Sequence, residues 1–330
     1  MNPALSVILL TTLIGVGQGL FLALFTAQSY ALFGLLPAQD GPGFYAPGSL
    51  IVLLFMGAGL FASFFHLGRP ERAWRSAAQW RTSWLSREVI VLPAFMGVVA
   101  LYALAQWYDW RPLLLTLPSG LGIDATVALG TLAWLLSFVL FVCTGMIYAC
   151  LRFLREWHTP LTVFNYVLLG GASGFTLAAA VAAYTAPALL GFFAGWAVII
   201  TLLGLASRLA SLARNARLRA KSTLQTAIGV KHPAIRQTAT GFTGGSFNTR
   251  EFFHQRSRRL LRAVQGFFLL AAFVLPVLLL AAGMNSGSGG LLLLAFLVQY
   301  CGLLAERWFF FAQANHPQNL YYAASGGPRA

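Results

Sequence analysis

Three ionisable side chains fall in or beside long apolar stretches, and they are the residues that could do chemistry. Glu88 and Glu306 are the acidic residues inside such stretches, and His66 ends another one. Ionisable groups are costly in these surroundings, which makes them functional candidates by default. A carboxyl group and an imidazole close to water can donate and accept protons.

Proton exchange of this kind suits a quinone headgroup. Each ring oxygen needs a hydrogen-bond donor, and reduction takes up two protons that oxidation releases. His66 could bond a quinone oxygen while Glu88 exchanges protons. Arg69 and Arg81 lie close to them in depth, and Glu306 falls in the same half of the membrane. The residues alone leave an alternative open, in which His66 and Glu88 are interfacial side chains satisfied by water and arginine.

The elements that must position these groups are membrane-spanning helices. The 330 residues are 58% hydrophobic and only 9% charged, whereas a soluble domain carries roughly 25% charged residues. Apolar stretches long enough to cross a core of about 30 Å lie at residues 4–36, 46–67, 84–106, 124–150, 160–185, 188–213, 260–284 and 290–314. We therefore predict an all-α integral membrane protein, a bundle of eight transmembrane helices that forms a single domain over residues 1–330.

Basic residues are placed unevenly along the chain. Of 22 Lys and Arg, all but Arg111 lie after the second, fourth and sixth predicted helices or towards the C-terminal end. Positively charged loops stay in the cytoplasm, so we expect both termini to be cytoplasmic (N-in/C-in). The net charge of +14 then reflects membrane orientation and an intracellular partner rather than nucleic acid.

The basic segment 214–258 is the one sizeable hydrophilic piece of the sequence. It is either a solvated loop or a docking surface for a cytoplasmic partner. The run at 241–248, GFTGGSFN, favours an ordered element, because aromatic side chains in a basic loop need something to pack against.

Two other functions fit the sequence less well. Haem b in a membrane bundle usually needs facing histidines at membrane depth, and no histidine falls in the middle of a predicted helix. We therefore expect no haem, and no metal-ligand spacing is visible. A transporter would show ionisable groups near the bilayer midplane and internal repeats, and neither is visible.

Two short stretches resemble a known family. One begins at His66 and reads HLGRPERAW, and the other runs from Ser83 to Glu88 and reads SWLSRE. They resemble the HLG-x-P-x-RA and S-x-LS-x-E stretches of the membrane anchor subunit of dimethyl sulfoxide reductase-type complexes. Helix number and chain length are similar too, so the resemblance covers most of the chain.

The resemblance implies a function and a set of residues. In that family the subunit anchors a molybdopterin catalytic subunit and an iron–sulfur subunit, and it exchanges electrons with the quinone pool. The motif's His and Glu are tied to quinol binding in that family, which points to His66 and Glu88. With the residues close to them in depth or in the motif, the candidates for quinone binding and proton exchange are His66, Arg69, Arg81, Ser86, Glu88 and Glu306. The basic loops supply the candidates for docking the iron–sulfur subunit, which are Arg72, Arg75, Arg152 and Arg155. Substrate chemistry would take place on the partners.

The expected orientation distinguishes this chain from the best-known reductase of the family. In the best-known reductase of the family the corresponding quinol loop faces the periplasm, whereas the positive-inside pattern places it in the cytoplasm here. The long insertion at 214–258, with TGGSFNTREFF at 243–253, is similar to the cytoplasm-facing sulfite dehydrogenase branch. The resemblance implies a bacterial inner-membrane location. A purely structural anchor without quinone remains the alternative.

Overall fold

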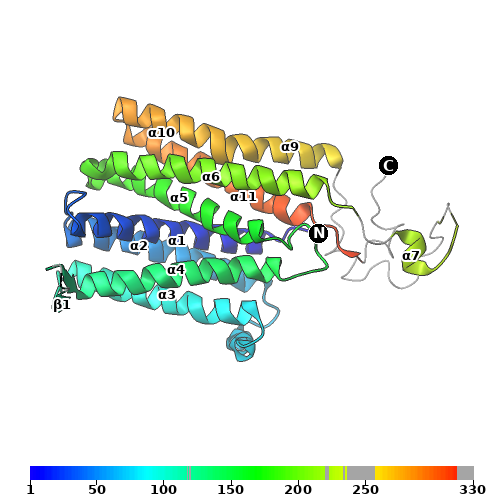
Figure 1. Cartoon of the computed structure of the whole chain (residues 1–330), viewed down its shortest axis with the longest axis horizontal. Helices are drawn as coiled ribbons and strands as arrows, with labels where there is room; N and C mark the ends of the chain where they lie inside the picture. The colour runs from blue at the N-terminus through cyan, green and yellow to red at the C-terminus, as the bar shows by residue number, and fades with distance from the viewer. Residues whose placement is uncertain (117, 119, 220–222, 233–234, 236–256, 318–330) are drawn as a thin grey trace.

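The computed structural model describes residues 1–116, 118, 120–219, 223–232, 235 and 257–317. Within these ranges, eight helices long and apolar enough to cross a membrane run side by side (Figure 1). Their ends agree with the predicted stretches to within five residues. The prediction of an all-α bundle of eight transmembrane helices is thereby confirmed.

The long helices follow one another through the bundle. They are α1 Leu5–Leu32, α2 Ala46–Ser63, α3 Trp84–Trp107, α4 Ala125–Ala149, α5 Pro160–Thr185, α6 Leu190–Ala216 and α11 Gly289–Ala312. The seventh span combines α9 Arg258–Leu269, a π-helical turn Leu270–Val274 and α10 Leu275–Ser286.

Short elements join the spans. Besides α7 Leu224–Ile228, the helical ones are a π-helical turn Gly41–Tyr45 and 3₁₀ helices at Phe64–His66, Pro70–Gln79 and Pro187–Leu189. Strands β1 Leu113–Thr116 and β2 Gly122–Asp124 pair antiparallel between α3 and α4.

Polar side chains mark where several helices begin. Ser83 accepts a hydrogen bond from the backbone N–H of Ser86 at the start of α3, at 3.3 Å. Asp124 does the same for Val127 at the start of α4, at 2.9 Å. Such caps satisfy N–H groups that have no partner within the helix. Ser83, the first residue of the second family-like stretch, therefore sets where α3 starts.

The centre of the bundle is the pair α1 and α5. About 78% of the most apolar part of each is buried, against at most 44% in the other spans. Glycines allow the two backbones to touch: a Cβ at Gly19 would lie 2.0 Å from the carbonyl oxygen of Gly170. A Cβ at Gly174 would lie 2.0 Å from the carbonyl carbon of Gly19. Small residues spaced by four are a common way to bring membrane helices together.

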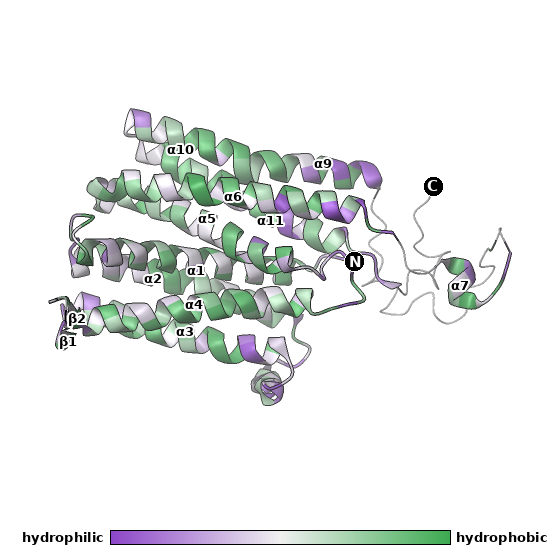
Figure 2. Cartoon of the chain, in the orientation of Figure 1, coloured by the Kyte–Doolittle hydropathy of each residue, from purple (hydrophilic) through white to green (hydrophobic). Residues whose placement is uncertain are grey.

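The two ends of the bundle differ in polarity. We call the end that carries the N-terminus and the connections 64–83 and 150–159 the basic end (Figure 1). Figure 2 shows hydrophilic residues gathered at this end of α3, α6 and α9, while the middles of the helices are mostly hydrophobic. The strands β1 and β2 lie at the opposite end.

Candidate functional site

Glu88 lies just over one turn into α3, close to the basic end. The residue is only 9% exposed, and its carboxylate accepts a short hydrogen bond from the hydroxyl of Thr144 in α4. Among the described residues this is the one hydrogen bond of the Glu88 side chain. The interaction joins α3 to α4. No basic side chain of the described residues forms an ion pair with this carboxyl group, and either of its protonation states can accept the bond from Thr144.

Arg87 fixes the start of α3 next to Glu88. Its Nε donates to the carbonyl oxygen of Trp80 at 2.9 Å, and its Nη2 donates to that of Arg81 at 2.8 Å. The guanidinium also stacks over the Trp84 ring, 4.2 Å from its centroid. These contacts hold the chain before α3 in one place and position Glu88 relative to it.

An apolar groove opens between α3 and α4 on the outside of the bundle. Its volume is about 360 Å³, and its lining is almost wholly apolar. The lining residues are Trp84, Arg87, Val91, Phe138, Val139, Val142 and Cys143. Arg87 and Cys143 directly precede Glu88 and Thr144 in the sequence, so the bond between Glu88 and Thr144 joins the same two helices beside this groove.

The other predicted quinone residues near α3 surround Glu88 in sequence but do not contact it. His66 and Arg69 are exposed, and His66 makes no hydrogen bond or ion pair within the described chain. Arg81 is also exposed, with its guanidinium 5.4 Å from the Trp80 ring centroid. Ser86 is buried, at 3% exposure, beside Glu88 on α3. The structure therefore brings these residues to the same end of the bundle without joining them in one contact network.

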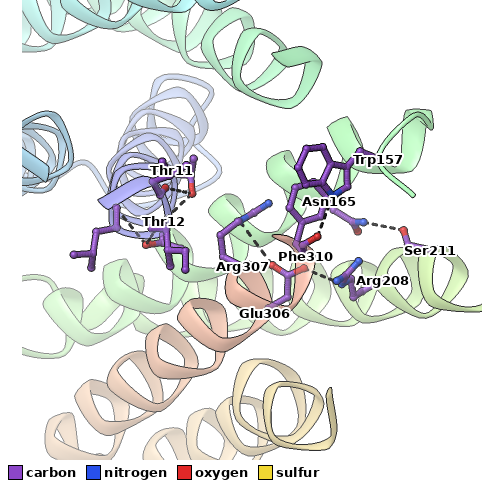
Figure 3. Close-up of polar contacts among 12 residues, drawn as sticks. Thr11, Thr12, Trp157, Asn165, Arg208, Ser211, Glu306, Arg307 and Phe310 are labelled. Atoms are coloured by element: carbon purple, nitrogen blue, oxygen red, sulfur yellow. Dashed lines mark hydrogen bonds and ion pairs between the residues drawn. The ribbon is translucent and has the colours of Figure 1, made fainter. Parts of the chain in front are cut away.

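Glu306 belongs to a separate buried ion cluster, shown in Figure 3. Its Oε1 lies 2.8 Å from Nε of Arg208 in α6, and its Oε2 lies 3.9 Å from Nε of Arg307. All three residues are at most 5% exposed. The guanidinium of Arg307 also lies 3.8 Å from the ring centroid of Tyr166 in α5. The cluster thus ties α5, α6 and α11 together near the basic end.

This cluster corrects one part of the sequence interpretation. The charge pattern groups Arg208 and Arg307 with the basic residues of the cytoplasmic side, but both lie inside the bundle. Helix α6 continues to Ala216, three residues beyond the predicted stretch, and Arg208 is neutralised there by Glu306. The position of Arg208 within an apolar stretch indicates that its side chain is buried. Its partner could not be identified without the fold, which brings Glu306 of α11 within reach of Arg208 in α6.

The predicted docking arginines all lie at the basic end. Arg72 and Arg75 are exposed on the 3₁₀ helix Pro70–Gln79, which Figure 1 shows end-on beside α3. Arg152 is exposed, and Arg155 is half-buried and donates to the carbonyl oxygen of Arg219. The runs at 241–248 and 243–253, which favour an ordered element and the sulfite dehydrogenase branch, lie outside the described residues.

Comparison with known proteins identifies the class. Residues 1–313 match the model of the DMSO reductase anchor subunit (DmsC) family, and the chain belongs to that family. It is a membrane anchor subunit of a DMSO reductase-family complex. It is also 60% identical over 322 residues to a sulfite dehydrogenase subunit of Allochromatium vinosum, a match that covers 98% of this chain and 99% of that protein. The predicted resemblance is confirmed.

Proposed function

We propose that this chain is the quinone-interacting anchor of a sulfite dehydrogenase-like complex in a bacterial inner membrane. The observation that carries the proposal is a buried carboxyl group, Glu88, on one of the two helices that line an apolar groove near the basic end. The identity to a subunit of sulfite dehydrogenase supports the choice of complex. The balanced reaction at the site is quinone + 2 e⁻ + 2 H⁺ ⇌ quinol.

The groove between α3 and α4 suits the isoprenoid tail of a quinone. Its volume of about 360 Å³ falls within the range of roughly 300–1,000 Å³ that ligand pockets span. It runs from Trp84, at the start of α3, to Phe138, which lies 11 residues before the end of α4. At 1.5 Å per residue that is about 16 Å towards the middle of the membrane. A tail in this groove places the headgroup at the basic end.

Two residues would interact directly with the quinone headgroup. Glu88 exchanges protons with it, because among the described residues its carboxyl group is held by a neutral hydroxyl and no cation pairs with it to fix it as the anion. His66, exposed at the end of the 3₁₀ helix Phe64–His66, donates a hydrogen bond to a quinone oxygen. Arg69, Arg81 and Ser86 complete the surroundings of the headgroup.

The basic end would receive the partner subunits. We propose that it faces the cytoplasm, with both termini on that side, because nearly all Lys and Arg residues lie there. An iron–sulfur subunit would dock on Arg72, Arg75, Arg152 and Arg155 and pass electrons to or from the quinone. A molybdopterin catalytic subunit would carry the substrate chemistry. The absence of haem from this chain stays a prediction.

Glu88→Gln tests the proposal in the assembled complex. The substitution keeps size and hydrogen bonding but removes proton exchange. We expect quinone-linked turnover to fall at least about 100-fold, while the activity of the catalytic subunit with an artificial dye is retained. Glu71→Gln is the matched control, because Glu71 is exposed and lies 3.9 Å from Arg72 at the same end. It should leave both activities unchanged.

Two results would contradict the proposal. Normal quinone-linked turnover in Glu88→Gln would remove the proton role of this residue. Failure of the wild-type complex to bind a quinone analogue would favour a purely structural anchor.

A further inference from the structure

Buried polar atoms that make no hydrogen bond gather around the Arg208–Glu306–Arg307 cluster. They are Asn165 Oδ1, Tyr166 OH, Ser207 Oγ, Arg208 Nη2, Glu306 Oε2 and Arg307 Nε, none of which has a hydrogen-bond partner among the described residues. Buried polar groups in native proteins are almost always satisfied by protein or by ordered water. The number of such atoms in one region indicates an internal site that water enters.

A small cavity adjoins this cluster. Its volume is about 20 Å³, and its polar lining comes from Thr11 and Thr12 of α1, Tyr166 and Ser173 of α5, and Arg307 of α11. One water molecule needs roughly 10–15 Å³ and two to four polar partners. The cavity therefore fits a single water and is far too small for a quinone headgroup. Figure 3 shows Arg307 between Thr11 and Thr12 on one side and Glu306 on the other.

Tyr148 connects this region to Glu88. Its ring stacks on that of Tyr166, with centroids 5.8 Å apart and planes only 7° from parallel. Tyr148 lies one turn beyond Thr144 on α4, so the two side chains share a helix face. Thr144 is the residue that holds the Glu88 carboxylate.

On its other side the cluster continues to the surface of the basic end. Asn165, next to Tyr166, donates to the Ser211 hydroxyl at 2.9 Å. One turn further along α6, Arg214 donates to the carbonyl oxygens of Arg155 and His158 at 3.0 and 3.2 Å. Polar groups on α5 and α6 therefore lie between the exposed connection 150–159 and Tyr166.

We propose that Tyr166 and Tyr148 form a proton route between water at the basic end and Glu88, beside the Arg208–Glu306–Arg307 cluster. The proposal rests on the quinone function proposed above. Each tyrosine hydroxyl releases its proton towards Glu88 and takes up another from the side of Arg214, so neither residue changes overall. Two such transfers supply one quinone reduction, and the reverse flow serves quinol oxidation.

The charge of the cluster suits transfer between hydroxyl groups. Two arginines against one glutamate leave one excess positive charge close to Tyr166. This excess charge disfavours a hydronium ion at the same place. A proton that is passed from hydroxyl to hydroxyl avoids moving a separate positive charge past two guanidiniums.

Tyr166→Phe is the test, because it removes the hydroxyl and keeps the ring that stacks on Tyr148 and lies under Arg307. In the assembled complex we expect quinone-linked turnover to fall at least about tenfold. The solvent deuterium isotope effect on that turnover should rise, because proton transfer becomes limiting. Quinone-analogue affinity and artificial-dye activity should match the wild type. Tyr148→Phe should behave in the same way.

Tyr102→Phe is the control for losing a buried tyrosine hydroxyl elsewhere. Tyr102 is fully buried in α3 and donates to Gln28 at 2.6 Å, towards the opposite end of the bundle. It should leave the isotope effect unchanged. Wild-type turnover in either Tyr166→Phe or Tyr148→Phe would overturn the route, as would lowered turnover with an unchanged isotope effect. If Glu88→Gln is impaired in the same assay, such a result removes only the route and leaves the quinone function standing.

Discussion

Glu88 and Glu306 are both buried near the basic end, yet their surroundings differ. Glu306 is neutralised by Arg208 and Arg307, so its carboxylate is part of an ion cluster that holds helices together. Breaking such a buried cluster by removing one partner typically costs about 3–5 kcal/mol. Within the part of the chain that the structure describes, Glu88 is held only by the neutral hydroxyl of Thr144. This difference is the reason for assigning proton exchange to Glu88.

Thr144→Val tests whether quinone-linked turnover depends on the hydrogen bond that positions Glu88, and not only on the presence of the carboxyl group. Valine has nearly the shape of threonine but donates no hydrogen bond, so the Glu88 carboxylate loses its partner at a cost of about 1–3 kcal/mol. We expect quinone-linked turnover to fall severalfold while dye activity and assembly are kept. Steady-state assays of the purified complex with a soluble quinone measure this.

Thr131→Val is the matched control on the same helix. The hydroxyl of Thr131 donates only to the carbonyl oxygen of Val127 in its own helix, at 2.8 Å. This substitution should leave turnover close to wild type. Equal effects of the two variants would mean that the bond to Glu88 has no special importance.

At the residue scale the sequence predicts some positions and misses others for a physical reason. Glu88 could be found because a carboxyl group within an apolar stretch stands out and a short motif marks it. The roles of Thr144, Tyr148 and Tyr166 could not be found. Threonine and tyrosine are ordinary residues in membrane helices, and only the packing of α4 against α3 and α5 brings these side chains together.

Among the helices, α1 and α5 hold a special position because their backbones touch through glycines. Membrane helices gain little from burying apolar surface against one another, since lipid is equally apolar, so close backbone packing takes its place. The contact also brings Thr11 and Thr12 of α1 to the cavity that Tyr166 and Arg307 line. The site near the basic end therefore depends on this helix pair.

Gly174→Ala should destabilise the protein, because its new Cβ would meet the backbone of Gly19 at 2.0 Å. Overpacking of this kind typically costs about 1–3 kcal/mol. We expect a lower melting temperature in detergent and weaker retention of the partner subunits. Gly97→Ala is the control, because a Cβ at this position of α3 meets nothing within 4 Å. Similar melting temperatures for the two variants would contradict a close α1–α5 contact.

The spans themselves were predictable to within a few residues, because lipid demands about 20 consecutive apolar residues from every crossing helix. The short elements were not predicted. The 3₁₀ helix Pro70–Gln79 has no buried residue, so no periodic pattern of core residues marks it in the sequence. The π-helical turn Leu270–Val274 within the seventh span is as apolar as the residues around it, so the sequence does not mark it.

For the molecule as a whole, orientation decides which compartment supplies protons and partners. Both the ion cluster and Glu88 lie near the basic end, so they share whichever side that end faces. The exposed basic residues of this end remain the argument for the cytoplasm after Arg208 and Arg307 are set aside as buried.

Reporter fusions test this orientation. Gly41, in the turn before α2, and Ser286, at the end of α10, both lie at the end of the bundle opposite the basic end. A periplasm-active reporter such as alkaline phosphatase should be active at both positions, and a cytoplasm-active reporter should be active at Thr223, next to α7. A cytoplasmic signal at Gly41 or Ser286 would reverse the orientation and move the proposed docking surface to the other side.

The meeting of α1 with α5 also constrains how the chain is made. Between Leu32 and Pro160 the ribosome must deliver α2, α3 and α4 before the glycine face of α1 can find its partner. At about 5–20 residues per second, that wait is on the order of ten seconds. During it, α1 is already in lipid with its most closely packing surface unfilled. The first helix must therefore stay near the insertion site until the fifth arrives, or the later helices will enclose a bundle that lacks its centre.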